Sequence, residues 1–474
     1  MRDINSYDVQ DYDYRVEIKN LGVENQKLRR EILEYQQSYD RLKNELDSII
    51  YSRSWKLTKP LRFLNSAFKK NKNNHSESIR LLHSPENEKV KSNYDGIPVY
   101  QAEYQNDQDF SKFKTDIKTL AFYLPQFHEF KENNEWWGKG FMEWTNTKKA
   151  KPRFKGHYQP RIPHDDFGYY TLDNVETIKK QVNLAKKHGI YGFCFYYYWF
   201  SGKRLMEKPI DLFLNDKSIN FPFCLCWANE NWTRTWDGLE TDILIKQDYT
   251  KKDQINFIKD AKKYLEDERY IRIDDKPLIM IYNPYSIPEF ENVIKNWRKT
   301  AKEIGIGDIC IWCKTDLADE ENKFTDFVDG EFDFPPLGIG HEAVKIKGLP
   351  SPKIFNYEKL VTDIEHLYRE HFPLKAFYYT CTMGWDNSAR KKENYTIYYN
   401  YSLESYYKWL RILIEETRRR HAQDKRFLLI NAWNEWAEGT YLEPDKKYGY
   451  ANINTLSKAI FNIPLEKNEK NKKL

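Results

Sequence analysis

Two glutamates stand three residues apart in the segment Trp433-Asn-Glu-Trp-Ala-Glu438. Cleavage of a glycosidic bond needs one acid that protonates the departing oxygen and a second carboxylate that serves as nucleophile or base. Two carboxylates in a cleft of low dielectric constant push their pKa values apart, so that one keeps its proton near neutral pH. A turn after a strand can aim Glu435 and Glu438 at one bond, and we predict them as a catalytic pair. The alternative is a helix cap or a rim salt bridge, and Glu230 is a rival for one of the two roles.

The elements that must position this pair are eight short apolar runs that begin near residue 117. They cover residues 120–124, 191–199, 223–227, 278–282, 309–313, 327–332, 376–381 and 427–432. Amphipathic helical stretches lie between them, at residues 174–188, 251–266, 289–302, 357–368 and 403–420. Parallel strands that helices cover on both faces appear in a sequence as continuous apolar runs. The pattern predicts an α/β fold, a (β/α)8 TIM barrel over residues 117–462.

An open doubly wound sheet is the alternative arrangement of such repeats. It would usually carry a glycine-rich phosphate-binding loop after the first strand. The first run continues instead into Pro125-Gln-Phe-His128, which favours the closed barrel.

Polar, acidic and aromatic residues follow six of the eight runs, at the strand ends where a barrel carries its active site. A single Trp or Asn at a strand end is more often a packing or capping residue, but agreement among six ends favours a site. We predict that the substrate contacts Tyr123, Gln126, His128, Glu143, Trp144, Tyr197, Trp199, Trp227, Asn229, Glu230, Trp232, Trp236, Asp333, Trp385, Asp386, Trp433, Asn434 and Trp436.

The composition is compatible with a carbohydrate ligand. Aromatic residues make up 16% of the chain, with 14 Trp and 35 Tyr. Flat rings stack on the apolar faces of sugars, although a large aromatic core would account for most of them. The 76 basic and 71 acidic residues nearly balance, with a net charge of +5, and do not indicate a nucleic-acid partner.

Metal and thiol chemistry find little support in the sequence. No HExxH motif occurs, and His366 and His371 are five residues apart and do not share a helix face. Asp11-Tyr-Asp13 has a metal-binding spacing but does not follow a strand. The six cysteines, the pair Cys310 and Cys313 included, fall in apolar strand-like runs, so we expect buried free thiols in a reducing compartment. We expect no metal and no cofactor.

The N-terminal part differs from the barrel repeats. A heptad pattern in residues 14–50 predicts a coiled coil, placed at residues 1–51, that self-associates, or else a single helix packed on the barrel. Residues 52–68 mix basic and apolar side chains, which suits either the surface of an anionic membrane or a docked helix end. Residues up to 116 are a linker, and residues 463–474 are a disordered tail.

Two features indicate the cell compartment. No apolar run approaches the roughly 20 residues that span a bilayer, and the mean hydropathy is −0.84. Residues 1–14 lack the basic start and apolar stretch of a secretory signal. We expect a cytoplasmic protein, with peripheral contact at the inner face of the membrane as an option.

Several long motifs resemble the WbsX-like family, whose members belong to loci for bacterial O-antigen and other surface polysaccharides. They are Phe122-Tyr-Leu-Pro-Gln-Phe-His128, Trp136-Trp-Gly-Lys-Gly-Phe-Met-Glu-Trp144, Gly156-His-Tyr-Gln-Pro160, Phe195-Tyr-Tyr-Tyr-Trp-Phe200, Trp227-Ala-Asn-Glu-Asn-Trp232, Gly384-Trp-Asp-Asn387 and Asn434-Glu-Trp-Ala-Glu-Gly-Thr440. The resemblance covers roughly residues 117–460. It implies a role in lipopolysaccharide biosynthesis, often under the label of glycosyltransferase. The segment 52–62 is similar to an extension found on enzymes of lipopolysaccharide assembly.

That family is similar in turn to the endo-α-mannosidases and endo-α-mannanases of glycoside hydrolase family ninety-nine, which are retaining barrel enzymes. Their motif Asn-Glu-Trp-x-Glu-Gly-Thr matches residues 434–440. The resemblance implies that Glu435 acts as base on the sugar 2-hydroxyl, giving an anhydro-sugar intermediate. Glu438 would be the general acid and then the base.

Three functions follow as expectations. The first is a retaining glycoside hydrolase or transglycosylase that acts on an oligo- or polysaccharide. The second is a glycosyltransferase that depends on a sugar nucleotide, and the third is a non-catalytic scaffold that binds glycans.

Overall fold

The computed structural model describes residues 100–234, 239–315, 324, 326–337, 353–370 and 375–466. The chain divides into two compact units, residues 1–89 and 90–474, and the described residues all belong to the second. The predicted coiled coil, the basic segment 52–68, the linker up to residue 99 and the tail from residue 467 therefore lie outside the described residues. Within the described part, no helix is long and apolar enough to cross a membrane.

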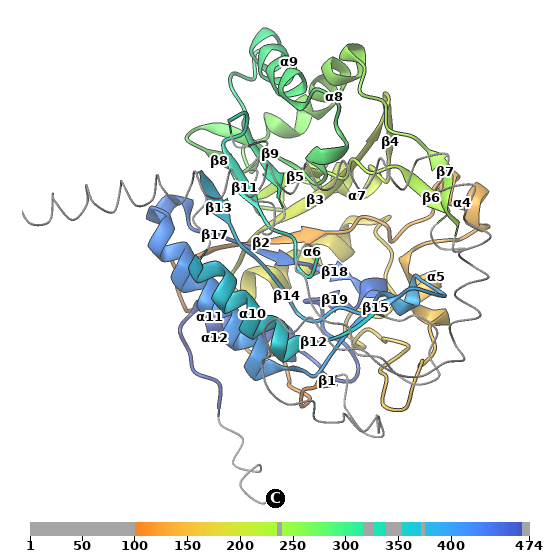
Figure 1. Cartoon of the computed structure of the whole chain (residues 1–474), viewed down its shortest axis with the longest axis vertical. Helices are drawn as coiled ribbons and strands as arrows, with labels where there is room; N and C mark the ends of the chain where they lie inside the picture. The colour runs from red at the N-terminus through yellow and green to blue at the C-terminus, as the bar shows by residue number, and fades with distance from the viewer. Residues whose placement is uncertain are drawn as a thin grey trace, which may run out of the picture. The chain divides into compact units, whose positions relative to one another are not determined.

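A ring of parallel strands forms the centre of this unit (Figure 1). Neighbours pair in the order β13-β11-β10-β9-β5-β3-β2-β17-β14. Their bounds are β2 (Lys118–Tyr123), β3 (Ile190–Phe200), β5 (Phe223–Trp227), β9 (Lys276–Ile281), β10 (Cys310–Lys314), β11 (Gly330–Phe332), β13 (Ala376–Tyr378), β14 (Thr380–Thr382) and β17 (Phe427–Asn431).

The strands β13 and β14 explain how the ring comes close to closing. They belong to one predicted run and are separated only by Tyr379. The first half pairs with β11 and the second half pairs with β17, both in parallel. The sheet is therefore a nearly closed, barrel-like α/β sheet whose strands follow one another in chain order. A doubly wound sheet would reverse its strand order at a switch point, so that alternative is wrong.

All eight predicted runs contain strands of this sheet, and all five predicted helical stretches contain helices. The helices are α6 (Val175–Lys187), α8 (Lys251–Leu265), α9 (Phe290–Glu303), α10 (Tyr357–Glu370) and α11 (Leu403–Arg420). Side chains of Asn174, Thr250 and Ser402 cap the first turns of α6, α8 and α11. A further helix, α12 (Ala451–Ile460), packs on α11.

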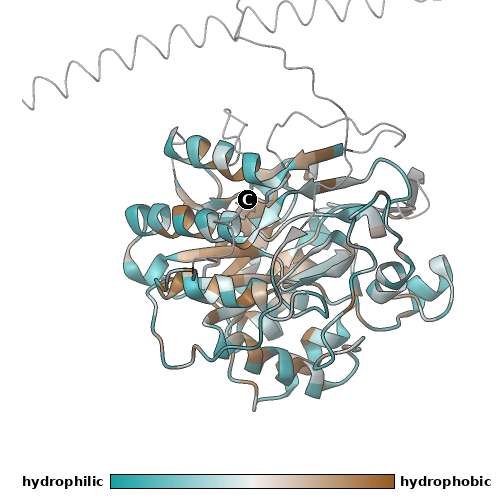
Figure 2. Cartoon of the chain, turned by 90° about the horizontal axis from the view of Figure 1, so that it is seen from below, coloured by the Kyte–Doolittle hydropathy of each residue, from teal (hydrophilic) through white to brown (hydrophobic). Residues whose placement is uncertain are grey.

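Burial on both faces is the physical reason for the continuous apolar runs. Every residue of β5 and β17 is buried. In Figure 2 the strands are mainly brown, whereas the surrounding helices alternate between brown and teal. Each helix covers the sheet with its apolar face and exposes its polar face to water.

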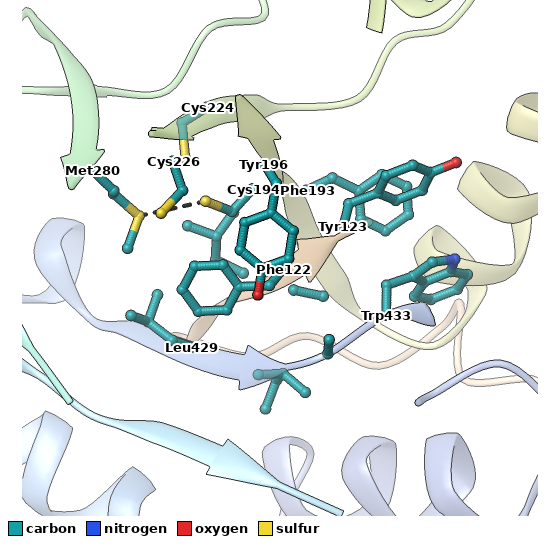
Figure 3. Close-up of a cluster of buried hydrophobic side chains, with 14 of the residues drawn as sticks. Phe122, Tyr123, Phe193, Cys194, Tyr196, Cys224, Cys226, Met280, Leu429 and Trp433 are labelled. Carbon is teal, nitrogen blue, oxygen red and sulfur yellow. Dashed lines mark hydrogen bonds between the residues drawn. The ribbon is translucent and has the colours of Figure 1, made fainter. Parts of the chain in front are cut away.

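Aromatic rings and thiols fill the interior of the barrel (Figure 3). The ring of Phe122 stacks on Tyr196 with centroids 5.7 Å apart. The thiol of Cys194 lies 3.5 Å from the sulfur of Met280 and close to Cys224 and Cys226. All six cysteines are buried and free, as the prediction of buried thiols requires.

Candidate active site

A cavity of about 280 Å³ opens beyond the C-terminal ends of the strands. Most of its lining residues lie on β3 or follow the strands β2, β5, β9, β11, β14 and β17. The others belong to the helix α4 (Lys131–Trp137) or, in the case of Leu244, to β7 (Leu239–Ile245). They are Leu124, Gln126, Asn133, Trp137, Tyr196, Tyr198, Ala228, Glu230, Asn231, Trp232, Leu244, Tyr282, Phe334, Asn387, Arg390, Lys391, Glu435 and Glu438. Both predicted catalytic glutamates thus face one cavity.

The two glutamates lie on a short hairpin that follows β17. It consists of β18 (Asn434–Glu435), the 3-10 turn η6 (Trp436–Glu438) and β19 (Thr440–Tyr441). The side chain of Asn434 ties its start to the end of β2, because it accepts a hydrogen bond from Leu124 N at 2.7 Å and donates one to Leu124 O at 3.0 Å. The turn closes at Gly439 with a φ of +66°, where a Cβ atom would lie only 3.0 Å from Arg161 Nη2. Glycine is required there for both reasons.

Behind the hairpin, the buried carboxylate of Glu443 holds the tryptophans that flank the two glutamates. It accepts hydrogen bonds from Trp433 Nε1 at 3.1 Å and Trp436 Nε1 at 2.7 Å. Gln181 Nε2 and the Tyr170 hydroxyl complete its partners at 2.7 and 2.8 Å. Burial raises the pKa of Glu443 to about 7. These four donors fix the direction in which the hairpin presents its acids.

Arg390 connects the acidic side chains of the cavity. Its Nη2 atom lies 2.5 Å from Glu435 Oε2 and 3.1 Å from Glu143 Oε1, and its Nη1 atom lies 2.5 Å from Glu438 Oε1. Glu143 begins helix α5 (Glu143–Lys149), is fully buried, and also accepts a hydrogen bond from Ala437 N at 2.7 Å. One guanidinium thus faces three carboxylates, and this contact holds both predicted catalytic acids at the same wall.

The position of Arg390 depends on Asp386, which caps the short helix η4 (Asn387–Ala389). The carboxylate of Asp386 contacts His157 Nε2 and Gln159 Nε2, both at 2.8 Å. Burial alone would raise the pKa of Asp386, but His157 and Arg161 hold it well below its usual range. The Asp386 amide also donates to Glu438 O at 2.7 Å, so this charged anchor joins the Arg390 segment to the hairpin.

The two candidate catalytic acids bind their protons unusually tightly. Burial raises the pKa of Glu435 to about 8, because the attraction of Arg390 is outweighed by desolvation and by the neighbouring carboxylates of Glu438 and Glu143. Burial also raises the pKa of Glu438. A raised pKa favours the protonated form of a carboxyl group, which general acid catalysis requires.

The profile of the family described as glycosyltransferase WbsX matches residues 119–456. The chain belongs to the WbsX glycosyltransferase family. It is also 38% identical over 352 residues to the uncharacterized protein WxcX of Xanthomonas campestris pv. campestris strain B100, and the match covers 73% of this chain and 50% of WxcX. WxcX of a second strain, ATCC 33913, matches with the same identity and coverage. The chain thus spans about half the length of the curated relatives that it matches.

The chain is also similar to solved structures. A glycoside hydrolase-like protein superposes with a TM-score of 0.50 at 15% identity, over 75% of this chain and 97% of that chain. The GH99 endo-alpha-mannosidase of Bacteroides thetaiotaomicron has a TM-score of 0.44 at 16% identity, over 74% of this chain and 97% of that one. Membership of the family indicates a carbohydrate-active enzyme, and the glycoside hydrolase-like protein shows a similar fold.

Five of the residues predicted for the site line the cavity of this WbsX-family chain: Gln126, Glu230, Trp232, Glu435 and Glu438. Glu143 and Asn434 lie directly behind the lining and contact it through hydrogen bonds. Asp386 does not line the cavity. It caps the helix η4, which leads into Arg390, and so it positions a residue of the lining. Trp236 lies outside the described residues.

The strand β3 presents different residues to the cavity from those predicted. Tyr196 and Tyr198 line the cavity, whereas Tyr197 and Trp199 point to the helix α8. The Tyr197 hydroxyl donates to Asp260, and Trp199 Nε1 donates to Asp253 at 3.0 Å. Alternate residues of a strand face opposite sides, so the predicted pair lies on the face opposite to the cavity.

Other predicted contacts are buried in the scaffold rather than in the cavity lining. Tyr123 donates to Gln181, His128 contacts Pro125 O, and Trp144 donates to Tyr170 O. Trp227 packs on Phe257 and Trp297, and Asp333 accepts from Tyr368 and from Thr380 N. The Asn229 side chain donates a hydrogen bond to Asn283 O and accepts one from Asn283 N. Trp385 O accepts a hydrogen bond from Tyr398 N. The indole nitrogens of Trp433 and Trp436 donate to Glu443. These contacts indicate that the residues hold the loops around the cavity in place.

The lining residues absent from the predicted set are Asn133, Trp137, Tyr196, Tyr198, Tyr282, Phe334, Asn387, Arg390 and Lys391, among others. Arg390 is the most consequential of them. It follows the motif Gly384-Trp-Asp-Asn387 by three residues, but nothing in the local sequence marks it as a partner of acids 45 and 48 residues away. In the ranges that the structure describes, no group of three or more His, Cys, Asp or Glu side chains has the geometry of a metal site.

Proposed function

We propose that this chain is a retaining glycoside hydrolase or transglycosylase that acts on bacterial surface polysaccharide, or on its lipid-linked precursors, with Glu435 and Glu438. The observation that carries the proposal is the contact of both glutamates with one guanidinium at a single cavity wall, each with a raised pKa. A glycosidase needs two acids that face one bond and at least one proton to donate. Membership of the WbsX family supports the carbohydrate substrate.

Glu438 suits the role of general acid. Its side chain is about one-fifth exposed, whereas that of Glu435 is 6% exposed. A departing sugar oxygen can therefore reach Glu438 more easily, and burial raises the pKa of Glu438, which favours the protonated form that a general acid needs.

Glu435 suits the role of base on the sugar hydroxyl only once it has lost its proton. Because its pKa is raised to about 8, the deprotonated fraction increases as the pH rises toward 8. We expect kcat/KM to have a rising limb in this pH range, set by Glu435.

The cavity also bears on the choice between a neutral sugar and a sugar nucleotide. Its ionisable lining consists of three acids, Glu230, Glu435 and Glu438, and two bases, Arg390 and Lys391. Arg390 already contacts three carboxylates, and the third of them, Glu143, adds a further negative charge behind the lining. When Glu435 and Glu438 carry their protons, Glu143 and Glu230 balance Arg390 and Lys391. The cavity then has no surplus of positive charge to attract a diphosphate, which favours a neutral glycan over a nucleotide-sugar donor.

The test compares the full chain with its Glu438→Gln variant on lipopolysaccharide O-chains and capsular polysaccharides of Gram-negative bacteria, with products analysed by mass spectrometry. We expect turnover to fall by more than about 10²-fold, the low end for loss of a general acid. Glu129→Gln is the matched control, because Glu129 lies in the loop between β2 and α4 and contacts Asn134 rather than the cavity. Near-normal turnover of Glu438→Gln would refute the assignment. Calorimetry with UDP- and GDP-sugars covers the alternative, since tight binding there would favour a glycosyltransferase.

A further inference from the structure

A second hollow, of about 540 Å³, lies beside the cavity at the same end of the barrel. Its lining comes from the segments that follow β5 and β9 and from the turn before α8: Asn229, Asn231, Lys246, Gln247, Asp248, Tyr249, Thr250, Ser286 and Pro288. Asn231 lines both hollows. Its Oδ1 atom accepts a hydrogen bond from the Gln247 backbone amide at 2.7 Å, so the wall between the two hollows is one side chain thick.

The side chain of Gln247 is the evidence that this second hollow binds a ligand. Of the buried amide side chains in the described ranges, those of Asn133 and Gln247 are the two whose nitrogen and oxygen both lack a hydrogen-bond partner. Asn133 lines the cavity and Gln247 lines the neighbouring hollow. Buried amides without partners are costly and rare in folded proteins. That the two cases lie at adjacent hollows of one rim indicates groups reserved for a polar ligand that spans both.

The chemistry of the hollow suits a sugar. A primary amide offers one acceptor and two donors, so it can bind two neighbouring hydroxyls of a pyranose at once. The Tyr249 hydroxyl lies 3.1 Å from both Asn229 O and Ser286 Oγ, which fixes its aromatic ring at the edge of the hollow. Lys246 and Asp248 bring one charge of each sign, so the hollow selects for a neutral ligand.

We propose that this hollow is a second sugar subsite, in which Gln247 binds neighbouring hydroxyls of a glycan whose reacting unit occupies the cavity. The proposal rests on the proposed function and extends it. The substrate is a chain of at least three sugars that crosses the Asn231 wall.

The experiment measures binding of the catalytically blocked full chain, Glu438→Gln, to an array of neutral bacterial surface oligosaccharides of one to six sugar units, followed by calorimetry on those that bind. Gln247→Leu and Asn133→Leu are added separately, because leucine keeps the side-chain size and removes the hydrogen bonds. Gln423→Leu is the matched control, since this glutamine lies in the 3-10 turn η5 (Gln423–Lys425) before β17, at the opposite end of the barrel. Thermal unfolding of each variant shows that it is folded.

We expect Gln247→Leu to weaken binding of chains of three or more units at least ten times more than binding of one or two units. We expect Asn133→Leu to weaken all lengths, and Gln423→Leu to weaken none. If glycans bind but Gln247→Leu affects all lengths equally or has no effect, the subsite is wrong while the proposed function stands; its amide would then be held by water alone. If no oligosaccharide of any length binds the parent chain, the proposed function fails, and the subsite with it.

Discussion

The two ends of the barrel combine carboxylates and guanidiniums in opposite proportions. At the C-terminal end, the carboxylates of Glu143, Glu435 and Glu438 share the single guanidinium of Arg390. At the N-terminal end, the one carboxylate of Asp116, just before β2, lies between two guanidiniums, Arg418 at 2.6 Å and Arg426 at 2.5 Å. The cluster around Arg390 has more acids than bases, and the cluster around Asp116 has more bases than acids.

The pKa values follow this difference. Hydrogen bonds from Arg418 lower the pKa of Asp116 to about 2, although burial opposes the change. At the other end the effect of burial is larger than the attraction of Arg390, and the pKa of Glu435 rises to about 8. A carboxylate whose charge is balanced by neighbouring cations stays charged and stabilises the fold. A buried carboxyl group with too few neighbouring cations holds a proton, which it can give to a substrate. The direction of the pKa shift therefore distinguishes the structural ion pair of Asp116 from the cluster that we propose is reactive.

Removal of Arg390 should have the largest effect, because it leaves three buried carboxylates without their cation. We expect Arg390→Met to lower the free energy of unfolding by about 3–5 kcal/mol at pH 8, the cost of breaking a buried ion pair. The loss should shrink as the pH falls toward 4.5, since protonated glutamates need no cation. Chemical denaturation at several pH values measures both quantities.

The matched control for this prediction is Arg153→Met. Arg153 contacts the same segment, but through the backbone oxygens of Ser388 and Lys391, at 3.2 and 3.3 Å. Its loss should be smaller and independent of pH. An equal pH-independent loss in both variants would mean that Arg390 acts by packing, and the contrast between the two ends would not hold.

Replacement of Glu443 tests the effect of burial at the C-terminal end of the barrel, at a position outside the cavity. Because its pKa is raised from 4.5 to about 7, its contribution to stability is fully present below pH 4.5 and is lost as the pH rises through 7. Glu443→Gln should cost about 1–3 kcal/mol at low pH, since four donors then face an amide, and the difference from the parent should narrow between pH 4.5 and 7. Thermal unfolding across this range is the measurement, with Glu303→Gln on the exposed face of α9 as control. A difference that widens with pH would contradict the raised pKa.

The smallest effect is expected at the N-terminal end of the barrel. Asp116→Asn should cost less than about 1 kcal/mol at neutral pH, because the pair is partly exposed. The lowered pKa means that Asp116 stabilises the folded state above pH 3.8 and that this contribution is lost as the pH falls to about 2. The variant should therefore lack the decline in stability that the parent shows between these pH values, and its turnover should equal that of the parent. Altered turnover would show that the two ends are coupled.

The sequence by itself determined the scaffold and the position of the acids along the chain. The eight apolar runs predicted the strands because residues buried on both faces of a sheet must be apolar throughout. The motif from Asn434 to Thr440 predicted which glutamates reach the rim, and these two line the cavity. Both are local properties, set by residues within a few positions of each other.

Only the tertiary structure decided which groups meet around those acids. The contacts of Arg390 with Glu143 and Glu435 join residues 247 and 45 positions apart, and no local pattern encodes them. The face of β3 was equally undetermined, because a run of aromatic residues from Phe195 to Phe200 has no polar alternation to show that Tyr196 and Tyr198, rather than Tyr197 and Trp199, point inward. The direction and the partners of a side chain depend on how distant strands align in the nearly closed ring, and that alignment exists only once the chain has folded.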